Sequence, residues 1–244
     1  MNTREARDLA QSVAALVNSG HAEQSYALLA PVLARRTPFR LLGLVGEAIG
    51  TGPPDAVFAF VDYIAAQGTM GGWVIIGSAL GQQLDRDLSA AFSRCRSCIV
   101  AADIWYATDI LGERVPGPAL VTDLGASLTL LAPWREDSNA WVGRAVGVSV
   151  HFWAKRSRGA VAQADKAQVL LAFLEPMFEE REMNAVKGVG WGLKTLGKHY
   201  SDLTADWLRE QLVHQQRPHR ALMLRKALTY LTDEQQSYAT GDAS

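Results

Sequence analysis

The stretch Ile99 to Gly112, IVAADIWYATDILG, shows the pattern that decides the fold. Its apolar residues recur at intervals of three or four, the spacing that places side chains on one face of an α-helix. These residues are Val100, Ile104, Ala107 and Leu111. The stretch is therefore predicted to be helical throughout, with one buried face.

The same spacing recurs along almost the whole chain, and no alternating pattern typical of strands competes with it. Breaks rich in Gly, Pro, Asp or Ser separate the segments, for example at Thr51–Pro54, Pro116–Pro118 and Asp137–Asn139. They predict about a dozen helices. Short connections favour antiparallel neighbours, so we expect an all-α superhelical stack of helix pairs, an α-solenoid with one concave face. A compact helical bundle would show the same pattern.

Length and composition favour a single globular domain. The chain has 244 residues, of which 48% are hydrophobic and 20% charged. We expect one domain over residues 1–232 and a polar, frayed tail over residues 233–244. No segment is apolar enough to span a membrane and the N-terminus does not resemble a secretory signal, so the protein is expected to be soluble and cytoplasmic.

Charge and cysteine content restrict the chemistry. The formal net charge of −1 excludes a chain that is basic overall, so DNA binding would depend on a local basic face. Cys95 and Cys98 form a C-x-x-C, but no second pair of Cys or His lies at the spacing of a zinc site. Two core-facing thiols, with no metal, are the favoured interpretation over a zinc or redox site.

Trp105 and Asp109 lie outside the apolar stripe of the opening stretch. They are four residues apart, so both project from one face of a helix. Asp109 would fall in the last turn, where the helix dipole disfavours an anion. The functional interpretation is an aromatic surface beside a carboxylate, and the structural one is a salt-bridged Asp109 with Trp105 covering the core.

Two later segments carry further unusual residues. Arg144 interrupts the apolar face of Asn139 to Arg158, one turn after Trp141, and would need an anion. Asp109, Glu182 and a phosphate are the candidates. Farther along, Gly188, Gly190 and Gly192 surround Trp191, which indicates either simple helix packing or close approach of another backbone with Trp191 exposed.

Together these segments resemble the AlkD-type family of DNA alkylation repair glycosylases. That family has a W-x-x-x-D helix, then W-x-x-R, then G-W-x-L-[RK]. The corresponding motifs here are Trp105–Asp109, Trp141–Arg144 and Gly190–Lys194, and Arg217–Tyr230 is similar to the family's closing helix. The resemblance covers about residues 70 to 231 and implies a superhelix of HEAT-like repeats with DNA in its concave face.

The resemblance also implies roles for individual residues. Asp109 would be the catalytic carboxylate, with Trp105 and Trp191 as aromatic walls. The implied DNA contacts are Arg144, Lys194, Trp141 and Lys187. The implied enzyme is a monofunctional glycosylase that excises 3-alkyladenine and 7-alkylguanine from duplex DNA without flipping the base. It would use no metal or organic cofactor, act as a monomer, and associate with the nucleoid when bound to DNA.

The near-neutral charge also motivates a second hypothesis from a different class of protein. A non-catalytic helical-repeat module could bind DNA structures or a protein partner. Such a module would bind equally well when Asp109 is replaced by asparagine.

Overall fold

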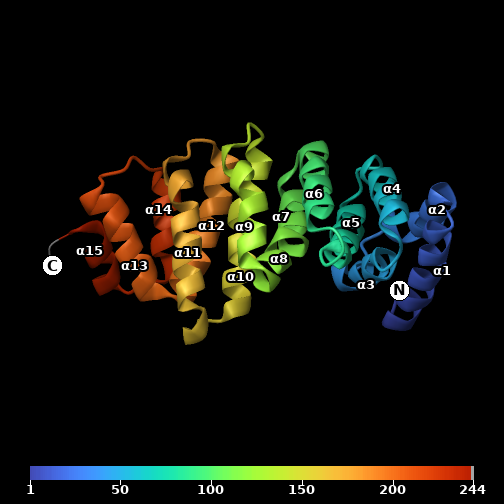
Figure 1. Ribbon diagram of the computed structural model, residues 1–244, viewed down its shortest axis with the longest axis horizontal. Coiled ribbons are helices and arrows are strands. Elements are labelled where there is room, and N and C mark those ends of the chain that lie inside the picture. Colours follow the sequence, from blue (N-terminus) through green and yellow to red (C-terminus); the bar gives the residue numbers. More distant parts are fainter. Residues whose placement is uncertain (243–244) are drawn as a thin grey trace. The chain divides into compact units, whose positions relative to one another are not determined.

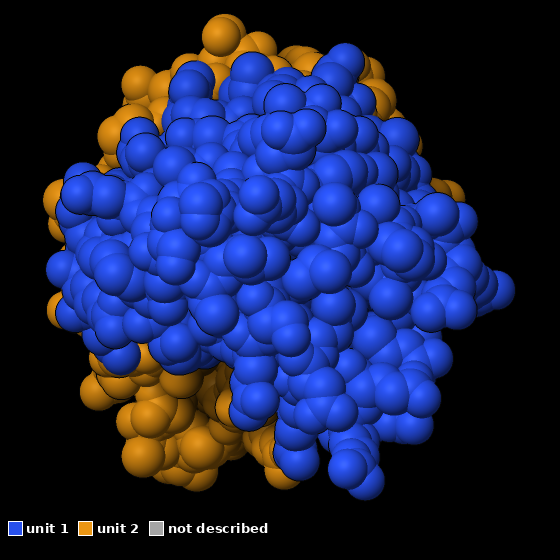
Figure 2. Space-filling view, turned by 90° about the vertical axis from the view of Figure 1, so that its right-hand side faces the viewer, with its two compact units in different colours: residues 1–115 blue, residues 116–244 orange. Residues whose placement is uncertain are grey.

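The computed structural model describes residues 1–242, which fold into two compact helical units, residues 1–115 and the part that begins at Pro116 (Figures 1 and 2). No strand occurs in this described part of the chain. The helices of unit 1 are α1 (Thr3–Asn18), α2 (Ala22–Leu33), α3 (Phe39–Gly50), α4 (Pro54–Ala65), α5 (Met70–Gln83), α6 (Leu88–Ala102) and α7 (Trp105–Arg114). Those of unit 2 are α8 (Pro116–Thr122), α9 (Leu124–Leu131), α10 (Ala140–Ser157), α11 (Ala164–Leu174), α12 (Met183–His199), α13 (Ser201–Arg209), α14 (Ala221–Ala227) and α15 (Asp233–Thr240).

Each unit has two layers of helices. In unit 1, α1, α3, α5 and α7 pack in sequence to form one layer, and α2, α4 and α6 form the other. In unit 2, α8, α10, α12 and α14 form the first layer, and α9, α11, α13 and α15 follow one another in the second (Figure 1). Alternate helices therefore stack on one another, as in helical-repeat proteins. The predicted all-α helical-repeat fold is confirmed.

Polar residues in the loops explain where several helices begin. The side chains of Asp87 and Asp123 accept hydrogen bonds from Ala90 N at 2.8 Å and Ala126 N at 3.0 Å. Asn139 does the same for Trp141 N at 2.9 Å and so fixes the start of α10. These side chains satisfy backbone N–H groups that have no partner inside the helix.

The prediction of a single helix over Ile99 to Gly112 was wrong. Asp103 has a left-handed backbone with φ of 46°, which ends α6 and lets α7 begin at Trp105. Val100 is consequently 38% exposed rather than buried in the core stripe. Asp109 lies in the middle of α7 and not in a last turn, because the helix continues to Arg114. The dipole argument against Asp109 therefore does not apply.

The C-terminal segment also differs from expectation. Residues Asp233–Thr240, predicted to fray, form α15, which starts at a capping box between Thr232 and Gln235 and packs on α13. The last two residues of that tail lie outside the described residues. A single domain over residues 1–232 stays a prediction.

The two cysteines lie on α6 and are buried, at 0% exposure for Cys95 and 3% for Cys98, as core-facing thiols should be. Burial raises the pKa of Cys98 to about 12, with a further contribution from Asp62, so this thiol is protonated at neutral pH. Among residues 1–242, no helix combines the length and apolar character needed to cross a bilayer.

Candidate nucleic-acid interface

Helices α10 and α12 pack so closely in unit 2 that their backbones touch. A Cβ on Gly147 would collide with the backbone of Gly188, and one on Gly188 would collide with the backbone of Arg144. A Cβ on Gly192 would come within 2.8 Å of Gly147 O. Of the three glycines around Trp191, Gly188 and Gly192 therefore lie where the backbone of α10 approaches closely, which was one of the two interpretations of the sequence. This contact holds the N-terminal half of α12 against the turn of α10 that carries Arg144.

This packing brings Trp191 onto His151. The two rings stack with centroids 4.0 Å apart and planes inclined by 24°. His151 Nδ1 lies 2.6 Å from Thr195 Oγ1, which in turn donates to Trp191 O at 3.0 Å. Because the Thr195 proton is directed to Trp191 O, the hydroxyl oxygen accepts from His151, which places the imidazole proton on Nδ1.

His151 is neutral at physiological pH. Burial, with smaller contributions from the nearby charges of Lys155 and His199, lowers its pKa to about 4. The residue is 8% exposed, which agrees with burial as the main cause. The stack with Trp191 is therefore one between two uncharged rings.

The pH dependence of stability should reveal this neutral histidine. In the unfolded chain His151 binds a proton near its ordinary pKa of 6.5, whereas in the native protein it does so only near about 4. The free energy of unfolding should therefore fall as the pH is lowered through this window, by at most about 3 kcal/mol. Urea titrations at a series of pH values should show a smaller fall for His151→Phe. Parallel curves for the two proteins would contradict this prediction.

Several cations of unit 2 gather around Lys226. Burial lowers the pKa of Lys226, and the like charges of its neighbours add to this effect. These neighbours are Lys194, Arg144, Arg225 and Lys187. Gly190 makes room for the lysine stem, because a Cβ there would lie 2.8 Å from Lys226 Cδ. Residues from α10, α12 and α14 thus contribute to one positive cluster.

Tyr230 extends this cluster toward the C-terminal end of α12. The Nζ atoms of Lys194 and Lys198 each lie 5.2 Å from the centroid of its ring, within the range of a cation–π interaction. The tyrosine is 48% exposed. We call the whole set the basic face, and it consists of Arg144, Lys187, Lys194, Lys198, Arg225 and Lys226.

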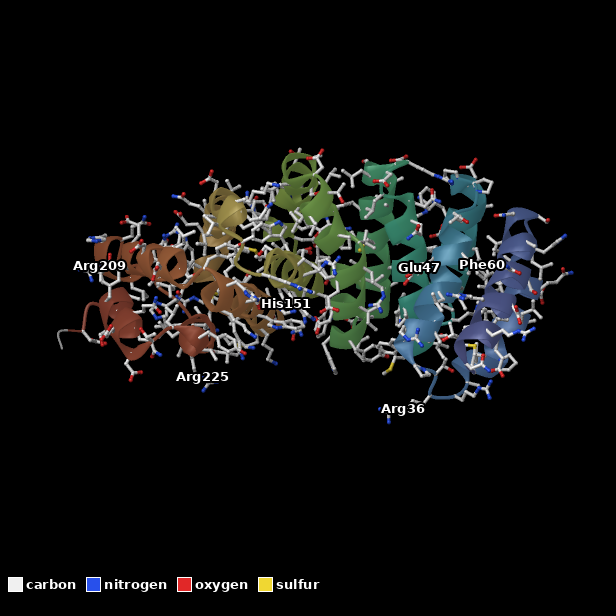
Figure 3. All side chains as sticks on the ribbon, turned by 90° about the horizontal axis from the view of Figure 1, so that it is seen from below. Arg36, Glu47, Phe60, His151, Arg209 and Arg225 are labelled. Atoms are coloured by element: carbon white, nitrogen blue, oxygen red, sulfur yellow. The ribbon has the colours of Figure 1, made fainter. Side chains whose placement is uncertain are left out.

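A cluster of like charges disfavours folding, so the fold alone would not select it. A polyanion would relieve the repulsion and release counterions on binding. In Figure 3, Arg225 projects away from the ribbon of unit 2, in keeping with its exposed position. Arg144 differs from the others in being 9% exposed. The arrangement can attract phosphates and hold them through several separate cations.

Neutralising one lysine of the basic face should weaken binding to any duplex. Lys198→Ala is expected to reduce the slope of log affinity against log salt by about 0.9, equally for damaged and undamaged DNA. Fluorescence anisotropy over a salt series measures this slope. Lys166→Ala, an exposed lysine of α11 in the second layer, is the matched control and should leave the slope unchanged. Equal slopes for Lys198→Ala and wild type would contradict the assignment.

Trp105 and Asp109 lie on α7 of unit 1. Trp105 is 56% exposed, and its ring meets Tyr106 edge-on at 5.8 Å between centroids. Asp109, one helical turn later, is half-buried. Trp105 and Asp109 thus lie one turn apart on the same helix, and their role as an aromatic surface beside a catalytic carboxylate stays a prediction.

The other five predicted site residues belong to unit 2. Arg144 on α10 and Lys187 and Lys194 on α12 lie near Lys226. Trp191 on α12 stacks on His151, and Trp141 is half-buried in the first turn of α10. Glu182 was one of the anions considered as a partner for Arg144. Its carboxylate accepts a hydrogen bond from Asn184 N and so caps the start of α12.

Five residues of this region were not predicted as site residues from the sequence, namely His151, Lys198, Arg225, Lys226 and Tyr230. His151 lies two turns after Arg144 on α10, inside an apolar run, so it looked like core. Lys198 follows Lys194 by one turn, and this spacing was a usable signal. Lys226 and Tyr230 become relevant only because α14 and the turn after it pack on α12.

A helical-repeat fold with a basic, aromatic-lined face defines a class of protein suited to nucleic acid. Within that class, the chain belongs to the DNA alkylation repair enzyme family, whose sequence model matches residues 54–231. The family predicted from the three motifs is confirmed, and the match begins earlier in the chain than expected. Membership gives the protein a role in DNA repair, with DNA as its partner. No curated protein and no solved structure was found to match the chain.

Proposed function

We propose that the protein is a monofunctional DNA glycosylase that excises 3-alkyladenine and 7-alkylguanine from duplex DNA and leaves an abasic site. The observation that carries the proposal is the pair on α7, an exposed Trp105 one turn from a half-buried Asp109, in a chain of this family. The basic face supports duplex DNA as the substrate.

The chemistry of alkylated purines suits these groups. A purine alkylated on a ring nitrogen is already cationic and leaves readily, so it needs little acid assistance and no metal or organic cofactor. Positive charge builds instead on the sugar as the glycosidic bond stretches. A carboxylate such as Asp109 stabilises that charge and can align or deprotonate the attacking water.

The aromatic and basic residues have complementary roles in this proposal. Trp105 and Trp191 are the aromatic walls, whose faces attract the cationic sugar and the alkylated base. Arg144, Lys194, Lys187 and Trp141 contact the DNA backbone. Recognition through backbone charge leaves the base stacked, so no extruded-base pocket is required and bulky adducts are tolerated.

Alkali treatment of a processed duplex tests the proposal. An end-labelled duplex with a single 7-methylguanine is incubated with the protein, and a break at the lesion is expected only after alkali, since abasic sites are alkali-labile. A matched undamaged duplex should stay intact. Tight binding without any alkali-dependent break would contradict the proposal and favour a non-catalytic binding module.

A further inference from the structure

We propose that His151 is a positioning residue for Trp191. The imidazole covers one face of the Trp191 indole and leaves the other face to the cationic sugar or alkylated base. This inference rests on the proposed function and adds to it a residue outside the family motifs. It assigns a role to a buried histidine that the basic face and the carboxylate chemistry do not use.

The stacking geometry carries the first step. With 4.0 Å between centroids and planes only 24° apart, the imidazole covers one side of the Trp191 ring. An indole has two π faces, and a cation interacts with it by lying over a face. Since Trp191 is half-buried and His151 occupies one face, the substrate can use only the opposite face.

Thr195 fixes the orientation of the stack. Its Oγ1 is 2.6 Å from His151 Nδ1 and donates to Trp191 O at 3.0 Å. The imidazole is thus tied through one hydroxyl to the backbone of the residue on which it stacks. Rotation of the imidazole would break this link, so His151 is held against one face of the Trp191 ring before DNA arrives.

The absence of charge on His151 matters for the same reason. Lys155 on its own helix and His199 on α12 act with burial to keep it neutral. A protonated imidazole would be a cation on the back of Trp191 and would compete with the substrate for the same π system. A neutral ring supports the indole without competing.

Three variants separate the stack from the hydrogen bond. His151→Ala removes both, His151→Phe keeps a ring but loses the link to Thr195, and Thr195→Val removes only the hydroxyl. We expect His151→Ala to slow single-turnover release of 7-methylguanine about tenfold, the upper range for one aromatic pair. His151→Phe and Thr195→Val should lose about threefold. The duplex dissociation constant should change by less than about twofold, and His21→Ala, an exposed histidine, is the control.

Trp191 fluorescence gives a readout that does not need catalysis. The Trp191 contribution is isolated by subtracting the spectrum of each protein carrying Trp191→Phe in addition. In wild type this emission should be quenched as the pH falls through about 4, when His151 becomes protonated, and His151→Phe should lose the transition. Adding methylated duplex should change the Trp191 emission of wild type, and this response should be reduced in His151→Ala.

The outcomes distinguish the two levels of the proposal. If wild type releases no base but the fluorescence changes occur, the glycosylase assignment fails and the positioning role for Trp191 stands. Release by His151→Ala at the wild-type rate would overturn the positioning role, and so would a Trp191 emission that is independent of His151 and of pH.

Discussion

Asp109→Asn is expected to slow the single-turnover release of 7-methylguanine by about three orders of magnitude. At about 4 Å and an effective dielectric constant near 20, a carboxylate and a sugar cation attract each other by roughly 4 kcal/mol. This attraction exists only as the bond breaks, so its loss raises the barrier directly. Asparagine keeps the shape of the side chain and removes the charge. The rate is measured with protein in excess over a methylated duplex.

Asp8→Asn provides the matched control for this experiment. Asp8 is an exposed aspartate of α1, also in unit 1, and its loss removes one negative charge without affecting α7. We expect its rate of release to equal that of wild type. A comparable loss of rate in both variants would show that the overall charge of the protein, and not the position of Asp109, controls release. A wild-type rate for Asp109→Asn would exclude the Asp109 carboxylate as the catalytic group.

Gly188→Ala is expected to lower the free energy of unfolding by about 3 kcal/mol. Alanine is the better helix former by about 1 kcal/mol, so helix propensity alone predicts a more stable protein. The added Cβ would, however, collide with the backbone of Arg144, and neither helix can yield as a flexible side chain would. Overpacking of this kind usually costs one to about 3 kcal/mol, occasionally more, and contact between two backbones belongs at the upper end.

Gly125→Ala is the control for this prediction. Gly125 lies in α9 of the same unit, and a Cβ there would be 3.7 Å from Asp123 Oδ1, an ordinary contact. Its stability should stay equal or rise by up to about 1 kcal/mol. Urea unfolding midpoints compare the three proteins. A Gly188→Ala variant as stable as Gly125→Ala would contradict the packing described for α10 and α12.

The helical fold could be predicted because the spacing of apolar residues and the capping side chains act locally. The break at Asp103 could not, because a left-handed turn usually requires glycine or asparagine, and aspartate reaches it less often. That one residue separates α6 from α7 and makes Trp105 the first residue of its helix. The surrounding sequence offers neither glycine nor proline to indicate the break.

The candidate site was predicted only as far as its motifs are continuous in sequence. Trp105 with Asp109 and Trp141 with Arg144 lie within one turn, so a single segment shows each pair. The basic face was hidden because a net charge of −1 averages its cations with acids elsewhere. Lys226 joins it only through the packing of α14 on α12. His151 was not predicted because it stands in an apolar stretch of α10, where a histidine is most simply interpreted as a core residue.

The most direct test of the central claim is chromatographic measurement of the free base released from a duplex with one 7-methylguanine. The proposed glycosylase predicts one free 7-methylguanine for each abasic site formed, and no guanine from a matched undamaged duplex. Bound duplex that keeps its methylated base, with no free base in solution, would contradict the claim.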